Sequence, residues 1–149
     1  MQENINESDI PAKGRIVAID PGTKHVGIAV SDESQLIATP IEPLPRSSWK
    51  KLLTDLRLII AKYDAVAVVV GLPLNTDGSE SEMSLIARDM ARKLGLSLSI
   101  PVRLQDERVT SYEARKRLWD RGIKPEDTKR LVDSEAAAII LSDFLDSRG

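Results

Sequence analysis

The segment Ala65–Val70 (AVAVVV) restricts the fold more than any other part of the sequence, because its six residues are all apolar. A strand that alternates apolar and polar residues keeps one face in water, whereas an unbroken apolar strand is covered on both faces. The run ends at Gly71-Leu72-Pro73, which is typical of a break in regular structure. We therefore expect a central strand in a sheet with helices on both sides.

Two amphipathic helices flank this strand in the sequence. From Trp49 to Tyr63, apolar residues recur every three or four positions and line one helical face. A second such segment begins near Ser79, which forms a predicted capping box with Glu82, and it closes at Gly95. Helical crossovers join parallel strands, so the central strand should run parallel to a short strand at Pro101–Gln105.

The N-terminal part predicts an antiparallel meander. Arg15–Asp20 is β-branched and apolar, ends at Pro21-Gly22, and is followed by a second extended run at Val26–Val30. A third short stretch is expected around Leu36–Thr39. It should end there, because three prolines that break regular structure follow at positions 40, 43 and 45.

Two further helices are expected toward the C-terminus. Thr110 and Glu113 suggest a capping box for a basic helix that ends near Gly122, and a last helix should span about Leu131–Leu145. The complete order is β-β-β-α-β-α-β-α-α. It predicts an α/β fold with a mixed five-stranded sheet, made of an antiparallel hairpin plus parallel strands and flanked by helices.

Length and composition limit the chemistry. The 149 residues suit one domain, which we place at residues 14–149 after a disordered polar tail at residues 1–13. The chain has no cysteine and one histidine, which excludes thiol catalysis and cysteine-type zinc sites and disfavours a Ser-His-Asp triad. Any catalysis is left to carboxylates, lysines, arginines and hydroxyls.

Charge and hydropathy bear on partners and location. We find no secretory signal or membrane anchor in the tail, and the longest apolar run is far below the ~18 residues of a membrane span, so we expect a cytoplasmic protein. The net charge of −2 argues against a surface that is basic throughout. Between Arg103 and Arg130, however, nine basic side chains stand against six acidic ones, which is typical of a solvated helix face and allows a local basic patch.

Acidic residues stand where such a sheet exposes its side chains. Asp20 ends the first strand, Asp106 and Glu107 end the last, and Asp133 lies near the start of the final helix. Each alone is typical of a turn or a helix start. Together they suggest a cation site, because clustered carboxylates repel one another unless a divalent ion neutralises them. Oxygen ligands favour Mg²⁺ or Mn²⁺, and two such ions can cleave a phosphodiester without a histidine base.

The turn after the first strand has features of a phosphate contact. Gly22 permits a tight turn and close approach of a ligand, while Thr23 and Lys24 can meet phosphate oxygens. His25 is more typical of a turn residue facing water than of a substrate contact.

Four segments in order carry a resemblance to a known family. They are DPGTKHVGIAVSD, VVGLPLNTDGSES, QDERVTSYEA and VDSEAAAIIL, which begin at Asp20, Val69, Gln105 and Val132. Together they resemble the YqgF/RuvX family, over about residues 14–146. That family is named both for Holliday junction resolvases and for nucleases of the 5′ end of pre-16S ribosomal RNA. The resemblance implies a ribonuclease H-like fold and divalent-metal nuclease activity.

The same resemblance implies roles for single residues. Asp20 matches the metal ligand of the first strand, and Asp133 matches the carboxylate of the last helix. The Asp106-Glu107 pair supplies a further carboxylate, and a one-residue difference in strand register decides which of the two faces the site. Arg108 is placed to meet a phosphate. The departures, at Pro21 and His25-Val26, remove no ligand.

Three functions remain open. The first is a metal-dependent endonuclease that processes the 5′ end of pre-16S rRNA within ribosomal precursor particles, with Arg108, Arg115 and Arg117 contacting phosphates. The second is a resolvase of branched DNA, which the two-fold symmetry of a junction requires to be a homodimer rather than a monomer. The third is a nonenzymatic ribosome-assembly factor that binds RNA through the Arg115–Arg121 helix. A two-lobed sugar-kinase type of ATPase is excluded by the chain length.

Overall fold

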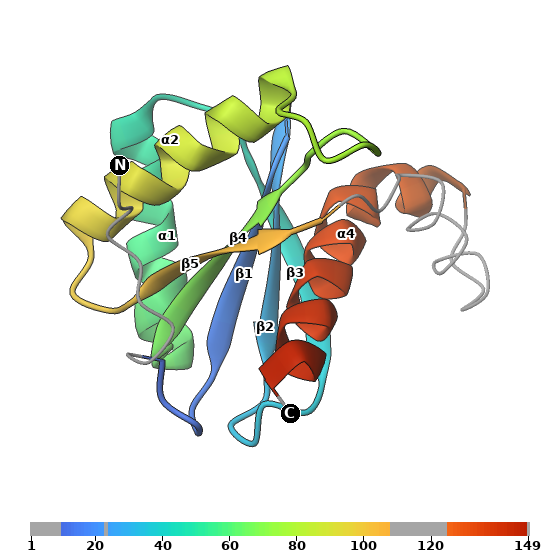
Figure 1. Cartoon of the computed structure of the whole chain (residues 1–149). Coiled ribbons are helices and arrows are strands. Elements are labelled where there is room, and N and C mark those ends of the chain that lie inside the picture. Colours follow the sequence, from blue (N-terminus) through green and yellow to red (C-terminus); the bar gives the residue numbers. More distant parts are fainter. Residues whose placement is uncertain (1–9, 23, 108–124, 149) are drawn as a thin grey trace.

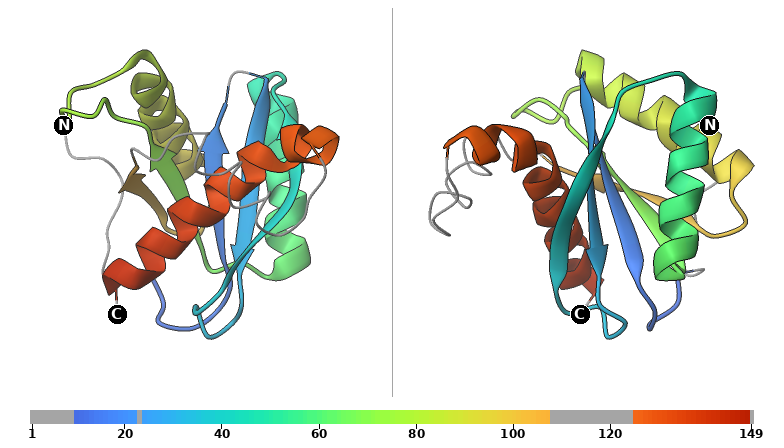
Figure 2. Two further views of the ribbon diagram at one scale, coloured as in Figure 1. Left: turned by 90° about the vertical axis from the view of Figure 1, so that its right-hand side faces the viewer. Right: turned by 180° about the vertical axis from the view of Figure 1, so that it is seen from behind.

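The computed structural model describes residues 10–22, 24–107 and 125–148, without the side chains of residues 125–131 and 133. Its described part has three layers (Figures 1 and 2). A five-stranded sheet lies in the middle, with two helices, α1 and α2, on one face and one helix, α4, on the other. We call these the two-helix face and the α4 face.

The sheet has the strand order β3-β2-β1-β4-β5. Its strands are β1 (Ile16–Pro21), β2 (His25–Ser31), β3 (Ala38–Pro45), β4 (Ala67–Leu72) and β5 (Val102–Asp106). β1 pairs antiparallel with β2, and β2 with β3, whereas β4 runs parallel to both β1 and β5. The predicted mixed sheet is therefore confirmed, and β4 is its apolar, wholly buried strand.

The helices are α1 (Trp49–Tyr63), α2 (Glu82–Ser97) and α4 (Pro125–Arg148). α1 has the predicted bounds. Its first-turn amides are capped by Ser48, and it ends at Asp64, which adopts a left-handed conformation with φ 52°. α4 begins six residues before the expected start. The basic helix expected at Thr110–Gly122 lies outside the described residues.

Each face of the sheet carries its own apolar core. On the two-helix face, Leu52 and Leu56 of α1 and Leu94 of α2 are buried against alternate strand residues. On the α4 face, Leu141 and Phe144 cover the other set of strand residues. Division into two cores explains why β4 carries no polar side chain, since both of its faces are covered.

The third strand does not stop at the prolines, so this part of the prediction is wrong. β3 runs from Ala38 through Pro40, Pro43 and Pro45. The reason is its place in the sheet: β3 is an edge strand and pairs only with β2 among the described strands. A proline lacks the backbone donor, which an edge strand does not need on its outer side.

The turn between β2 and β3 is held by Asp32. Its carboxylate accepts hydrogen bonds from the amides of Leu36 (2.8 Å) and Ile37 (2.9 Å), and these bonds lower the pKa of Asp32. Gln35 takes up the positive φ of 58° that the turn requires. Among the described residues, Ile10 already belongs to the core on the α4 face: it is 6% exposed and lies four residues before the boundary expected at residue 14.

The capping box of α2 is formed by other serines than predicted. Ser81 Oγ accepts from the amide of Ser84 (2.9 Å), and Ser84 Oγ accepts from the amide of Ser81 (2.7 Å). Ser79 instead binds Asp77 Oδ1 through both its amide and its hydroxyl, and so belongs to the preceding loop. Several serines in this stretch offer the same capping chemistry, and the path of the loop selects among them.

Within the residues described, no helix is both long and apolar enough to cross a membrane.

We predict that Ser81→Ala lowers the free energy of unfolding by about 1 kcal/mol, because it removes the cap and leaves first-turn amides without their acceptor. The hydroxyl also donates to the carbonyl of Pro73 (2.7 Å). Ser79→Ala, the matched control, should change stability by less than about 0.5 kcal/mol, since its contacts are exposed. Urea unfolding of both variants measures the difference, and an equal loss would contradict the assignment.

Candidate active site

Asp20 lies at the carboxyl end of β1 and points to the α4 face. Its orientation follows from strand alternation: Val17 and Ile19 belong to the core of the two-helix face, and Ile16 and Ala18 to the core of the α4 face. Asp20 continues the second series and is half-buried. The predicted first carboxylate therefore lies where a sheet edge meets a helix.

Alternation in β5 separates the two acidic residues at its end. Val102 and Leu104 pack on the two-helix face, and Asp106, which is exposed, continues that series. The amide of Glu107 donates to the carbonyl of Leu72 (3.0 Å), so the ladder with β4 extends one residue beyond the strand. Glu107 therefore falls on the α4 face, with its side chain buried and Oε2 shielded from solvent.

Asp20 and Glu107 thus share one face and one edge of the sheet, which the sequence alone left open. Among the described strands, β4 alone lies between β1 and β5. The backbones of the two acidic residues are consequently about two strand spacings, roughly 10 Å, apart across the sheet. Glu107 also lies two residues further along the strand direction, because Asp20 is level with Gly71 and Gln105. The side chain of Asp106 lies on the two-helix face at the same edge.

Gly71 of β4 leaves room for helix α4 between these strands. A Cβ atom at this position would lie 2.3 Å from Cδ1 of Ile140 and 3.2 Å from its Cγ1. A side chain at this position would require the Ile140 side chain to move. The absence of a Cβ at Gly71 therefore lets Ile140 of α4 pack directly on β4, next to the edge that carries Asp20 and Glu107.

Two contacts, one toward each end, fix α4 along its axis. The amide of Ile28 donates to Ser134 Oγ (3.3 Å) at a point where the β2–β3 register shifts. At the far end, Arg148 donates to Gln35 Oε1 (2.9 Å) and to the carbonyl of Ile10 (3.0 Å). These contacts hold the first half of α4 near the carboxyl end of β1, because Ile28 pairs with Ile19.

This docking places the backbone of Asp133 next to Ser134, beside the strand pair that carries Asp20. The Asp133 side chain lies outside the described part of the structure. Glu135, one residue beyond Ser134, is fully buried. Sequence reasoning missed Glu135, because its charge suggests a solvent-facing helix position rather than an interior one.

The remaining predicted contacts fall into two groups. Lys24 and His25 are exposed next to the turn that follows β1. Thr23, Arg108, Arg115 and Arg117 lie outside the described residues. Arg46, which sequence reasoning did not select, binds this turn twice: its amide donates to the carbonyl of Lys24 (2.8 Å) and Nη1 to the carbonyl of Gly22 (2.7 Å).

The donor chemistry fits a hard divalent cation. Asp20 and Glu107 offer carboxyl oxygens, which Mg²⁺ and Mn²⁺ prefer, and Oε2 of Glu107 is enclosed away from solvent. Among side chains that the structure describes, no three potential ligands of the His, Cys, Asp or Glu type gather at one point. The described part of the structure thus contributes two carboxyl groups on one face to a cation site, with the Asp133 backbone nearby.

The strand order and the helices on both faces define the class as a ribonuclease H-like fold. The structure of Thermus thermophilus RuvC in complex with a Holliday junction substrate has this fold: it matches with a TM-score of 0.55 and 19% identity, over 91% of this chain and 95% of RuvC. At this level of identity, the likeness concerns the fold alone.

The chain belongs to the RuvX family. Residues 14–147 match the model of this family, which is described as "Holliday junction resolvase". A relative from Rhodococcus erythropolis strain PR4 is 40% identical, over 94% of this chain and 82% of the relative. Another from Anaeromyxobacter dehalogenans strain 2CP-C is 39% identical, over 90% of this chain and 98% of the relative. Both relatives are named "Putative pre-16S rRNA nuclease".

We predict that Gly71→Ala destabilises the protein by about 1–3 kcal/mol, because the added methyl group overpacks against Ile140. Ile140→Val removes the nearest atom and should cost about 0.5–1.5 kcal/mol alone. The loss of stability in the double variant should be smaller than the sum of the two single losses, by at least about 0.5 kcal/mol.

Gly95→Ala, inside α2, serves as the control and should be neutral or stabilising. Denaturant unfolding of the four variants gives the coupling energy. Strictly additive losses would show that Gly71 and Ile140 do not limit the approach of α4.

Proposed function

We propose that this chain is a divalent-metal-dependent endonuclease that processes pre-16S ribosomal RNA at its 5′ end. The observation that carries the proposal is the convergence of Asp20 and Glu107 on one face at the carboxyl edge of the sheet. Membership of the RuvX family and the names of its relatives support the reaction and the substrate. We further propose that the reaction occurs in the cytoplasm, on ribosomal precursor particles.

In this proposal, Asp20, Glu107 and Asp133 hold Mg²⁺ or Mn²⁺. When bound, such ions lower the pKa of a water molecule and stabilise charge on the leaving oxygen of a phosphodiester. Asp106 holds no metal, since its side chain lies on the two-helix face. Helix α4 acts as a support: its contacts through Ser134 and Arg148 keep the Asp133 backbone at a set distance from β1.

The turn after β1 positions the RNA. Lys24 is exposed directly beyond Asp20 and can contact a phosphate, and Arg46 keeps the turn in place through two backbone carbonyls. Thr23, Arg108, Arg115 and Arg117 complete the proposed phosphate contacts. Such contacts supply affinity with little sequence preference, so precursor structure rather than base readout would select the cleavage position.

Substitution of Asp20 at the end of β1 and of the two acidic residues at the end of β5 tests the site. Asp20→Asn and Glu107→Gln should each lower the rate of precursor RNA cleavage in Mg²⁺ more than roughly 100-fold, because even residues that only support metal ligands account for 10- to 100-fold. Asp106→Asn, the matched control, should retain activity within about 3-fold, since Asp106 is exposed on the other face.

Single-turnover cleavage of precursor RNA gives the rates, and circular dichroism confirms that each variant folds. Loss of activity in Asp106→Asn together with full activity in Glu107→Gln would overturn the assignment of Glu107. Cleavage that persists in a chelator, or in Asp20→Asn, would overturn the proposed metal-dependent reaction.

Resolution of branched DNA is the second candidate, favoured by the description of the family model and by the RuvC-like fold. A four-way junction has two-fold symmetry, so a resolvase would act as a homodimer with two sites. Pre-16S RNA and a four-way junction should be incubated in parallel with the wild type and Asp20→Asn.

We expect cleavage of the RNA and at least about 10-fold slower cleavage of the junction. A protein that remains monomeric with the junction in sedimentation would agree with this result. Faster, paired incisions in the junction by a dimer would reverse the assignment of the substrate.

A further inference from the structure

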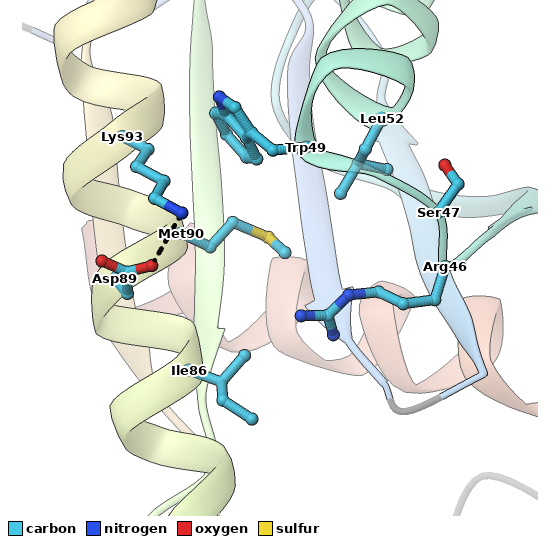
Figure 3. A pocket seen from close by; sticks show the side chains of 8 residues that line it. All are labelled: Arg46, Ser47, Trp49, Leu52, Ile86, Asp89, Met90 and Lys93. Carbon is cyan, nitrogen blue, oxygen red and sulfur yellow. Dashed lines mark ion pairs between the residues drawn. The ribbon is translucent and has the colours of Figure 1, made fainter.

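A cavity of about 240 Å³ lies on the two-helix face, between the start of α1 and the middle of α2 (Figure 3). Its lining combines an aromatic ring, three charged side chains and an apolar floor: Arg46, Ser47, Trp49, Leu52, Ile86, Asp89, Met90 and Lys93. The carboxylates Asp20 and Glu107 belong to the other face, so this cavity is a separate feature. Its volume is below the roughly 300 Å³ at which pockets for drug-sized ligands begin, so it can enclose one flat ring system rather than a whole nucleotide.

The cavity offers three kinds of contact at once. Trp49 presents an indole ring, and Lys93 Nζ lies 5.4 Å from the ring centroid. Asp89 pairs with Lys93 (3.1 Å) and Arg92 (2.8 Å), and these bonds lower the pKa of Asp89 and keep it ionised at neutral pH. Together they can recognise a flat aromatic ligand that carries both a hydrogen-bond donor and an anionic group.

Arg46 connects this cavity to the candidate active site. In Figure 3 its guanidinium group points across the cavity toward α2. The same residue binds the carbonyls of Gly22 and Lys24, in the turn that directly follows Asp20 and Pro21. The cavity and the carboxylates therefore lie on opposite faces of one sheet edge, with a single short turn between them.

We propose that this cavity binds the base of one unpaired nucleotide of the RNA substrate, near the phosphate that is cleaved. The base would lie against Trp49 and Met90, with Asp89 accepting from its donor groups and the Arg46 guanidinium contacting its phosphate. This inference rests on the proposed nuclease function for its choice of RNA. An RNA strand that crosses the turn after β1 would contact both faces of this sheet edge.

The composition of the cavity favours a nucleotide over a purely apolar or purely anionic ligand. Bases stack on aromatic side chains whatever the sequence, because every base has a π-face. Arg46 and Lys93 give the lining two positive charges against the single negative charge of Asp89, which suits a phosphate. The size of the cavity limits occupancy to one base, with its sugar and phosphate outside the cavity beside Arg46, rather than a duplex.

Tryptophan fluorescence tests the stacking directly. The chain has two tryptophans, so Trp119→Phe leaves Trp49 as the only one. In a chelator, titration with the ribonucleoside monophosphates of adenine, guanine and uracil should quench the Trp49 signal in a saturable way. Ribose 5-phosphate, which lacks a base, should not quench it. Absence of quenching, or equal competition by ribose 5-phosphate, would overturn the stacking of a base.

Variants then locate the site on the RNA-binding surface. Binding of a labelled single-stranded RNA, followed by anisotropy in a chelator, should weaken about 10-fold in Trp49→Leu and in Arg46→Gln. Lys62→Gln is the matched control, because Lys62 also lies over an aromatic ring, that of Tyr63 (5.4 Å), at the other end of α1. It should bind as the wild type does, and an equal loss in all three variants would overturn the site.

These measurements need no cleavage, so the two proposals fail separately. Should Trp49→Leu fold poorly, Ile86→Phe, which fills the cavity from the opposite wall, replaces it and should weaken binding to a similar degree. Normal cleavage by wild type, together with unchanged RNA affinity in the cavity variants, would end this inference and leave the nuclease intact. Nucleotide binding at Trp49 without any cleavage would support this inference and overturn the proposed nuclease function.

Discussion

The contact between Gly71 and Ile140 is the constraint on which the candidate site depends. It lets the Ile140 side chain of α4 pack directly on β4, because a single added carbon at Gly71 would collide with that side chain. Ser134 and Arg148 then set the position of the helix along its axis. Protein interiors are packed closely and respond to changes of one methyl group. The placement of the Asp133 backbone beside Asp20 is therefore a consequence of packing far along the helix as well as nearby.

The two proposals assign different roles to the two faces at the carboxyl edge of the sheet. On the α4 face, Asp20 and Glu107 are the proposed metal ligands. On the two-helix face, the cavity at Trp49 carries aromatic and positively charged groups suited to a nucleotide. The turn held by Arg46 joins the two sides. A nuclease with this arrangement would bind its substrate on one face of the sheet and cleave it on the other.

Prediction from sequence succeeded where a local residue pattern is compatible with only one kind of structure. The helix at Trp49–Tyr63 and the buried strand after it follow from periodicity, which burial enforces. Prediction failed where several solutions were chemically equal or where the position in the sheet mattered. Ser81 rather than Ser79 caps α2, since the loop path decides which hydroxyl reaches the first turn. β3 tolerates its prolines because it lies at an edge.

The sequence by itself determined the kind of chemistry: no cysteine, one histidine, and acidic residues at the ends of strands and at a helix start. It also determined the order of the described helices and strands, because apolar periodicity is a local property. Only the tertiary structure decided which acidic residue of β5 joins Asp20. That choice depends on the register of β5 against β4, where a shift of one residue exchanges the two faces. The cavity at Trp49 likewise arises from two helices that are distant in sequence and meet only on the folded sheet.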